Sequence, residues 1–277
     1  MQITPSGQAC GAAVTGVDLT RPLSPEQVAE IRAGWLTHHV LSFPDQSMTD
    51  DDLERYSGYF GGFGQDPFIA PIEGREHVIA VSRSANETAP LFAETWHSDW
   101  SFQTTPPAAT CLFGITIPPV GGDTFFADQH KALTLLPAAL RAKLEGKQAI
   151  HSAVGAYAPD GFYGEADKAS DRSMDIRPSE AARETHLHPF IRKHPETGEE
   201  GLFSCLGYII GIEGMSSAAA MELLREVYEY QGHDDVIYRH KWQKDMLVMW
   251  DNRSVLHHAS GGYEGHDRLL HRTTIAG

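Results

Sequence analysis

The stretch Trp96-His97-Ser98-Asp99-Trp100 contains residue types that bind metal ions. In an extended segment successive side chains alternate between two faces, so His97 and Asp99 point the same way while Ser98 points away. An imidazole nitrogen and a carboxylate oxygen on one face can bind a single ion together. The alternative is a structural His–Asp hydrogen bond, because an enclosed neutral histidine needs a carboxylate or a metal as its partner.

Two other segments carry a similar spacing. His233-Asp234-Asp235 follows Gly232 at the end of a helical pattern, and His194-Pro195-Glu196 lies in a turn-like sequence that ends at Gly198. Both patterns are typical of exposed loops. We therefore expect solvated charges at these two places.

A second group of polar residues lies near the C-terminus. The polar turn Asp251–Ser254 separates two apolar segments and leads to His257 and His258. Arg268 and Arg272 follow in a strand-like run, which places them on one face, about 13 Å apart at roughly 3.3 Å per residue. Because the chain has a formal net charge of −15, two cations on one face indicate a site for two carboxylate-like groups. An ordinary charge at a sheet edge is the alternative for Arg272.

Length and composition limit the class of protein. The 277 residues, 41% of them hydrophobic, are enough for one large globular domain or two modest ones. The 37 acidic residues outnumber the 22 basic ones, which argues against nucleic-acid binding and against attraction to an anionic membrane. No leader-like segment and no apolar run of about 18 residues is present, so we expect a soluble, cytoplasmic protein. The sequence leaves open whether it forms a homo-oligomer.

Apolar periodicity predicts a mainly β chain with a few flanking helices. Helices are predicted to start at the capping residues Ser24 and Thr49 and to cover 216–230, with short helical patches at 128–135 and 137–145. Short β-rich segments bounded by Pro or Gly predict strands at 40–43, 78–81, 110–115, 124–127, 189–192, 201–205, 236–240, 246–250, 255–257 and 269–272. Many short strands with few crossover helices favour an antiparallel sandwich or barrel in one domain. The cysteines, Cys10, Cys111 and Cys205, are expected to be reduced and packed.

Residues 155–185 differ from the rest of the chain. Glycine, aspartate and serine dominate there, and no periodicity is visible. A structureless segment of this length in a compact domain is usually disordered or a functional lid. We expect a lid over the site.

Taken together, these motifs resemble a known enzyme family. The similarity is to the taurine dioxygenase and 2,4-dichlorophenoxyacetate dioxygenase family of Fe(II)- and 2-oxoglutarate-dependent oxygenases. It spans nearly the whole chain, in identity and in spacing, and is carried by Trp96-His97-Ser98-Asp99, Gly121-Gly122-Asp123-Thr124, Trp250-Asp251-Asn252-Arg253, His257, Arg268 and His271-Arg272.

The resemblance implies both a fold and a set of roles. The fold would be a double-stranded β-helix, the cupin-like jelly roll, formed by residues 1–277 as one domain. The metal ligands for Fe(II) would be His97, Asp99 and His257. Thr124 and Arg268 would bind the distal carboxylate of 2-oxoglutarate. Arg272 would hold the anionic group of the primary substrate, and Trp250 would wall the pocket.

The implied reaction uses O2 to hydroxylate a C–H bond of a small anionic organic substrate, while 2-oxoglutarate is oxidised to succinate and CO2. The substrate would be a sulfonate, a sulfate ester, or an aryloxy or alkyl carboxylate. Three ligands on one face leave three octahedral positions, two for the cosubstrate and one for O2. A zinc or manganese hydrolase on the same fold and a non-catalytic cupin-like binding protein are the alternatives. A hydrolase does not explain two arginines and a threonine arranged for a dicarboxylate.

Other polar residues near these motifs are expected to be structural. His258 and His271 point to the opposite face of their strands, and Arg253 is expected to form an ion pair. Core or loop positions are expected for His151, His186 and His188.

The chain also differs from the taurine-specific members of the family. Ala93 stands where they have an asparagine, Asp66 and Ile69 lie near the places of a histidine and a tyrosine, and Phe203-Ser204-Cys205 replaces a further segment. The stretches that contain His97 and Trp250 are more similar to the aryloxyalkanoate branch.

Overall fold

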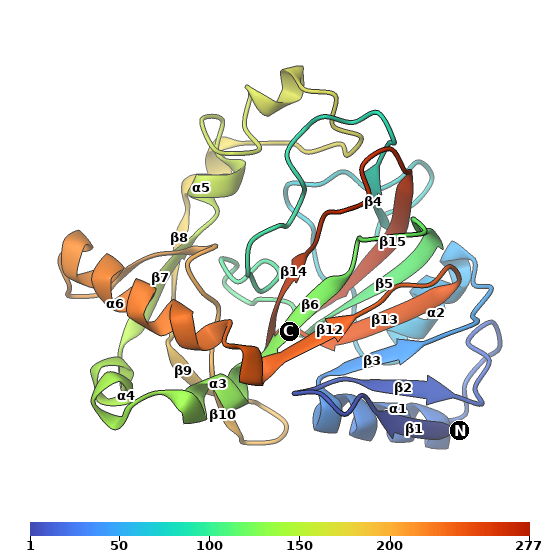
Figure 1. Ribbon diagram of the computed structural model, residues 1–277, viewed down its shortest axis with the longest axis horizontal. Helices are drawn as coiled ribbons and strands as arrows, with labels where there is room; N and C mark the ends of the chain where they lie inside the picture. The colour runs from blue at the N-terminus through green and yellow to red at the C-terminus, as the bar shows by residue number, and fades with distance from the viewer.

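A seven-stranded sheet is the largest element of the fold (Figure 1). In the computed structural model, which describes residues 1–277, its strands lie in the order β1-β2-β3-β13-β5-β15-β4. Only the β2–β3 pairing is parallel. The bounds are β1 Gln2–Pro5, β2 Ala12–Thr15, β3 Val40–Phe43, β4 Ile79–Arg83, β5 Ala109–Thr116, β13 Met246–Asp251 and β15 Arg268–Ile275.

Two helices cover the outer face of this sheet. They are α1 (Pro25–His38) and α2 (Asp50–Gly58), and each begins with the capping box that the sequence predicts. Alternate side chains of β13 lie on opposite faces of the sheet, because successive side chains of a strand point in opposite directions. Leu247 and Met249 pack in the core beneath the helices, whereas Val248 and Trp250 pack in a second core on the inner face.

A three-stranded sheet covers the inner face. Its order is β12-β6-β14, formed by Ile237–His240, Thr124–Asp128 and Val255–Ala259. Phe126 of β6 and Val255 of β14 share one buried cluster with Trp250 and Leu270 of the large sheet. The prediction of a mainly β chain with flanking helices is confirmed, and the candidate site lies between these two sheets.

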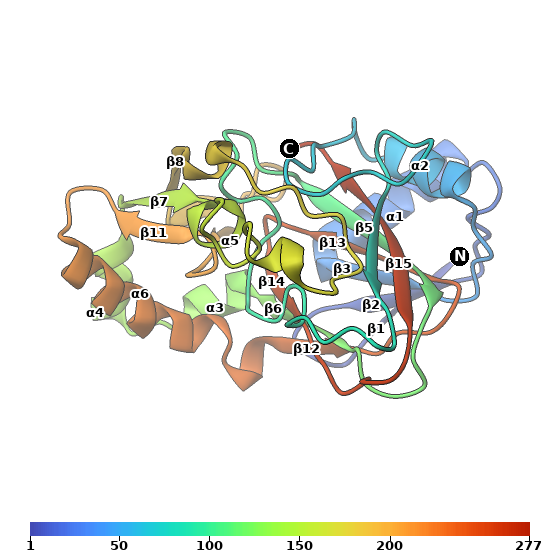
Figure 2. The ribbon, with the colours of Figure 1, turned by 90° about the horizontal axis from the view of Figure 1, so that it is seen from above.

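The remaining elements form a lobe at the other end of the long axis, with β6 and β14 between it and the large sheet (Figures 1 and 2). The lobe has its own apolar cluster. Its elements are α3 Gln129–Leu135, α4 Ala138–Leu144, β7 Gln148–Ser152, β8 Thr185–Pro189, β9 Ile191–Lys193, β10 Glu200–Leu202, β11 Ile209–Ile212, α6 Ser217–Gln231 and the 3-10 helix η3 Asp234–Val236.

The segment 155–185 is not structureless, which corrects the sequence-based expectation. It contains the end of α5 (Val154–Tyr157) and the short 3-10 helices η1 (Asp167–Ala169) and η2 (Glu180–Arg183). Hydrogen bonds to other parts of the chain hold this segment in place, although its sequence has no apolar periodicity. The Asp171 carboxylate accepts hydrogen bonds from the backbone N–H groups of Thr88 and Ala89 at 2.7 and 2.9 Å.

The three cysteines agree with a further expectation. All three cysteines are free and buried, as predicted. None of the helices is both long enough and apolar enough to cross a membrane.

Candidate active site

His97 and His257 are neighbours across an isolated antiparallel bridge. The backbone N–H of His97 donates to the carbonyl of His257 at 3.0 Å, and the reverse hydrogen bond is 2.8 Å long. The Ser98 hydroxyl donates to the carbonyl of Asn252 at 2.7 Å and so points away from the two imidazoles, as the alternation predicts.

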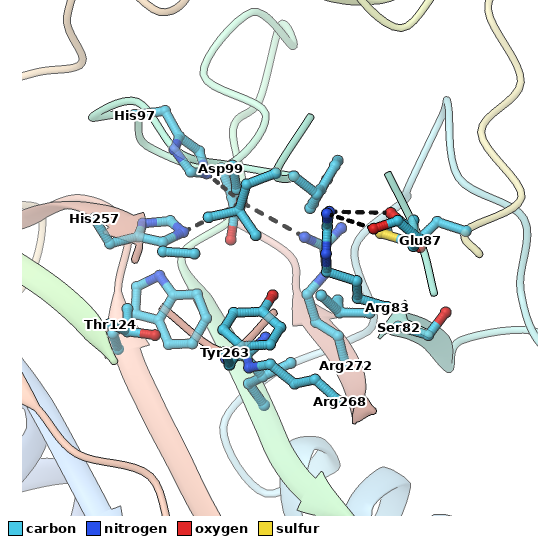
Figure 3. Close-up of a pocket in the computed structure, with 18 residues that line it drawn as sticks. Ser82, Arg83, Glu87, His97, Asp99, Thr124, His257, Tyr263, Arg268 and Arg272 are labelled. Carbon is cyan, nitrogen blue, oxygen red and sulfur yellow. Dashed lines mark hydrogen bonds and ion pairs between the residues drawn. The ribbon is translucent and has the colours of Figure 1, made fainter. Parts of the chain in front are cut away.

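The donor atoms of His97, Asp99 and His257 face one another (Figure 3). Nε2 of each histidine lies 3.7 Å from Oδ1 of Asp99, and all three residues are buried. Nδ1 of His97 lies 2.8 Å from the carbonyl oxygen of Thr95. If Nδ1 carries the proton and donates it there, the lone pair of Nε2 is free for a metal ion.

The charges around this cluster favour the forms that bind metals. Burial lowers the pKa of His97 against the opposing effect of Asp99, and burial together with His97 lowers the pKa of His257 further. Burial raises the pKa of Asp99, but His257, Arg272, His97 and the Thr110 hydroxyl outweigh it, so this pKa lies below its ordinary value. Neutral imidazoles and an ionised carboxylate are suitable donors for a divalent transition metal. The three residues therefore fit such an ion.

A chain of hydrogen bonds fixes the orientation of Asp99. The Thr110 hydroxyl donates to Oδ2 of Asp99 at 2.6 Å and accepts from the Asn252 amide at 3.0 Å. The Asn252 side-chain oxygen in turn accepts from Nε1 of Trp250 at 2.9 Å. Asn252, in the polar turn after β13, thus orients Thr110, which holds Oδ2 of Asp99. The other carboxylate oxygen, Oδ1, faces the histidines.

Arg268 and Thr124 line the same pocket as the histidines. The guanidinium of Arg268 is buried, has no carboxylate within ion-pair distance, and makes one hydrogen bond, from Nη2 to the carbonyl of Gly122 at 3.3 Å. Its Nε has no partner. The Thr124 hydroxyl accepts from Nε1 of Trp242 at 2.9 Å, so its own proton is free to be donated. Both side chains can therefore receive an anion.

Gly122 allows this approach. Its φ of +68° is one that side chains rarely adopt, and a Cβ there would lie 3.3 Å from Nε of Arg268. Gly122, two residues before β6, thus lets the backbone lie close to the Arg268 side chain.

Arg272 and Trp250 also line this pocket. The Arg272 guanidinium lies over the Trp100 ring at 5.1 Å and places Nη1 3.6 Å from Oδ1 of Asp99. Its Nη2 donates to Oδ1 of Asp66.

Several residues around this pocket were missed by the sequence analysis. Arg83 lies directly across from Arg268 in the β4–β15 register, two positions beyond the strand that the sequence predicts at 78–81. A longer predicted strand would have found Arg83. No local signal marked Glu87 or Tyr263, and Asp66 was noted only as a difference from the taurine-specific members of the family. The complete lining is Val81, Ser82, Arg83, Glu87, Leu91, Phe92, Ala93, His97, Asp99, Leu112, Thr124, Met174, Trp250, His257, Ala259, Tyr263, Arg268 and Arg272.

The expectation of solvated charge at His194 is wrong. His194 is buried, and its Nε2 lies 3.0 Å from Oδ2 of Asp251, which comes from a distant strand. Arg253 forms the predicted ion pair, at 2.6 Å to Asp251, and also contacts Glu196. His233 is exposed, as expected.

The remaining histidines lie outside the pocket. His258 stacks on Phe125 at 5.0 Å, and Nδ1 of His271 pairs with Asp50 at 2.6 Å, in agreement with their predicted orientations. His151 and His188 are buried in contact with each other, and His186 is partly buried.

A second group of ligand-type residues consists of His39, His130 and Glu199. Both ring nitrogens of His130 already have partners, the carbonyl of Glu200 and the hydroxyl of Ser254, each at 3.0 Å. His130 therefore has no free ring nitrogen for a metal ion.

Comparison with known proteins agrees with this geometry. The family model of the taurine catabolism dioxygenase TauD, TfdA family matches residues 2–274. The alpha-ketoglutarate-dependent 2,4-dichlorophenoxyacetate dioxygenase of Cupriavidus pinatubonensis is 32% identical, over 89% of this chain and 87% of its own. The alpha-ketoglutarate-dependent sulfate ester dioxygenase of Pseudomonas putida is 27% identical, over 100% of this chain and 90% of its own.

A solved structure is similar as well. A taurine dioxygenase from Burkholderia xenovorans superposes with a TM-score of 0.82 and 31% sequence identity, covering 100% of this chain and 89% of that one. The protein is thus an oxidoreductase, a 2-oxoglutarate-dependent dioxygenase, with 2-oxoglutarate being the compound that the relatives' names call alpha-ketoglutarate. It belongs to the taurine catabolism dioxygenase TauD, TfdA family.

Proposed function

We propose that this protein binds Fe(II) through His97, Asp99 and His257 and uses O2 and 2-oxoglutarate to hydroxylate a small anionic organic substrate. Bound iron would supply the activation of O2 for C–H oxidation, with succinate and CO2 as the coproducts of 2-oxoglutarate. The overall reaction is balanced, since one oxygen atom enters succinate and the other enters the hydroxylated product.

The observation that carries this proposal is the buried, uncompensated charge of Arg268 in the same pocket as the His97–Asp99–His257 cluster. Burying a cation without a counterion is costly, so the site is suited to an anionic ligand that pairs with it. The distal carboxylate of 2-oxoglutarate is such a group. Its 1-carboxylate and 2-keto oxygens would then reach toward the three metal-ligating residues.

The remaining residues are assigned to orientation and enclosure. Thr124 would donate its hydroxyl proton to the carboxylate held by Arg268. Thr110 would keep Asp99 in one orientation, which is the usual task of a residue that hydrogen-bonds to a metal ligand. Trp250 and Arg272 would contact the substrate. We further infer that the two sheets around the site form the double-stranded β-helix, with residues 155–185 as a lid.

The names of the relatives support our choice of substrate class. Two of them are named for a sulfate ester and for 2,4-dichlorophenoxyacetate, which are small organic anions. A sulfonate, a sulfate ester or an aryloxy or alkyl carboxylate is therefore our first choice for the substrate. A zinc or manganese hydrolase does not explain the placement of Arg268 and Thr124 for a dicarboxylate, and iron-dependent succinate formation would exclude a non-catalytic binding protein.

A succinate-release screen tests the proposal. The protein would be incubated with Fe(II), 2-oxoglutarate and O2 and with each candidate from those substrate classes. We expect substrate-stimulated succinate formation that stops when iron or O2 is removed. Turnover of a substrate without O2 and 2-oxoglutarate would instead identify a hydrolase.

A further inference from the structure

Three arginines line the active-site pocket, and two of them already have a carboxylate partner. Nη1 of Arg83 lies 3.2 Å from Oε1 of Glu87, and Arg272 donates to Asp66. Arg268 has no such partner. Only one of the three cations is therefore free to neutralise an anionic ligand.

The Asp66 carboxylate is held firmly beside Arg272. Its Oδ1 also accepts from Nε1 of Trp100 at 2.8 Å, and its Oδ2 accepts from the Thr274 hydroxyl at 3.2 Å. The Asp66 side chain is only 8% exposed. Three separate donors thus fix this carboxylate at the end of the Arg272 guanidinium, so the ion pair is part of the folded pocket.

The Arg83–Glu87 pair is constructed in the same way. The Glu87 side chain is 2% exposed, and its Oε2 accepts from the backbone N–H of Ser173 at 2.9 Å. Figure 3 shows this pair on the side of the pocket away from the histidines. Arg83 is accordingly no free anchor for an anion either.

Charge balance then limits what can bind beside Arg272. A divalent iron, the Asp99 carboxylate, the 2-oxoglutarate dianion and Arg268 sum to zero, and each of the two ion pairs sums to zero as well. An anionic group placed at Arg272 would lie close to both Asp66 and Asp99 without a surplus positive charge to hold it. Like charges brought together in this way are strongly unfavourable.

Arg272 nevertheless retains capacity for hydrogen bonding. Its Nε is buried and has no hydrogen-bond partner. A buried donor left unpaired destabilises the protein, so a ligand that offers an oxygen acceptor there would gain affinity. An acceptor without charge provides this hydrogen bond and avoids the repulsion from the two carboxylates.

We infer that Asp66 occupies the anion position at Arg272 and selects substrates that present an uncharged oxygen acceptor there, such as an ether, ester or sulfone. This inference rests on the proposed function and refines it. Asp66 is thus a specificity-determining residue.

A matched pair of ligands tests this assignment. Methanesulfonate and dimethyl sulfone have similar shapes and differ in charge, and their binding can be measured by calorimetry to protein loaded with Mn(II) and N-oxalylglycine, which does not turn over. We expect the wild type to bind the sulfone at least as tightly as the sulfonate. Asp66→Asn keeps the size of the side chain, removes its charge, and should tighten methanesulfonate binding roughly 10- to 100-fold. Binding of the sulfone should stay within about twofold.

The control variant is Glu226→Gln, which makes the same change in net charge at an exposed ion pair with Lys143, outside the pocket and the proposed lid. It should leave both affinities unchanged. A wild type that prefers the sulfonate about tenfold or more, or an Asp66→Asn variant with an unchanged preference, would overturn the inference. If Asp66→Asn does not fold, the preference of the wild type between the two ligands tests the inference alone. If the wild type binds neither ligand, a gain of methanesulfonate binding in Asp66→Asn supports the inference, and no gain overturns it. Failure of the proposed function would show separately, as no binding of Mn(II) with N-oxalylglycine, and the ligand pair would then be compared in the metal-free protein.

Discussion

His97 and His257 exchange both of their backbone hydrogen bonds, at 3.0 and 2.8 Å, although they come from opposite halves of the sequence. This bridge places the two Nε2 atoms at equal distances of 3.7 Å from one oxygen of Asp99. The backbone pairing therefore brings together the two imidazoles that we propose as metal ligands, close to one oxygen of Asp99. Changes in ligand side chains should affect metal binding far more than folding.

Replacing one of the proposed metal ligands should remove iron binding. His257→Ala should abolish stoichiometric Fe(II) binding and turnover, because two remaining donors hold a divalent ion poorly. Equilibrium dialysis under anaerobic conditions measures the bound iron. His258→Ala is the matched control, since the side chain of the next residue stacks on Phe125 outside the pocket. Equal loss of iron in both variants would argue against the assignment.

The affinity for the cosubstrate 2-oxoglutarate should depend on Arg268. Arg268→Met keeps the apolar stem and removes the charge, and it should raise the 2-oxoglutarate concentration needed for half-maximal succinate release by roughly 100-fold. Arg239→Met is the control, because Arg239 forms a half-exposed ion pair with Asp123, 2.6 Å away, next to Thr124. If the Arg268 variant keeps its normal requirement for 2-oxoglutarate, that carboxylate is bound elsewhere.

Thr110 should affect the metal ion through Asp99. Thr110→Val removes the 2.6 Å hydrogen bond to Oδ2 without a large change in volume, and Fe(II) affinity should fall roughly 10- to 100-fold. Thr273→Val removes a comparable buried hydroxyl, which contacts Ser57. Iron titrations of the two variants separate a metal-orienting role from a general packing effect, since only the first variant should lose affinity.

The Asp251 carboxylate should make the free energy of unfolding decrease at acid pH. Burial raises its pKa, but Arg253 and His194 outweigh this and lower the pKa to about 2. A carboxyl whose pKa is lower in the folded than in the unfolded state stabilises the protein above the unfolded pKa, and this contribution is lost as the pH falls. Linkage predicts a loss of about 1 kcal/mol between pH 5 and pH 3 from this residue. Urea unfolding of the wild type and of Asp251→Asn over this range measures it, and identical pH slopes would contradict the prediction.

The proposed lid should respond to ligands. Residues 155–185 are anchored through Asp171 and Ser173 to the loop that carries Glu87, and Met174 lines the pocket. Fe(II), 2-oxoglutarate and a substrate should slow hydrogen exchange and proteolysis in this segment, while the turn around Gly198 stays unchanged. A segment equally protected with and without ligands is not a lid.

Local patterns were enough to predict much of the fold. The capping residues Ser24 and Thr49 set the starts of the two N-terminal helices, and the apolar run 246–250 predicted the strand β13. The pair at His97 and Asp99 followed from a two-residue spacing, and the resemblance supplied His257 as their partner.

The errors and omissions have a common physical cause. His194 lies in a turn-like sequence but is buried, because Asp251 and Arg253 reach it from a distant strand. Asp66 likewise meets Arg272 only after the chain has folded. Such polar contacts leave no periodic trace in the sequence, and only the three-dimensional structure reveals them.

The central claim is that one iron ion binds to three side chains at the meeting point of two sheets. The most direct measurement is an anaerobic crystal structure with Fe(II) and 2-oxoglutarate, with the iron located by its anomalous scattering. The account predicts one iron about 2.0–2.2 Å from Nε2 of His97, Nε2 of His257 and a carboxylate oxygen of Asp99, with 2-oxoglutarate reaching Arg268. Iron bound at another place, or none bound while the protein stays folded and active, would contradict it.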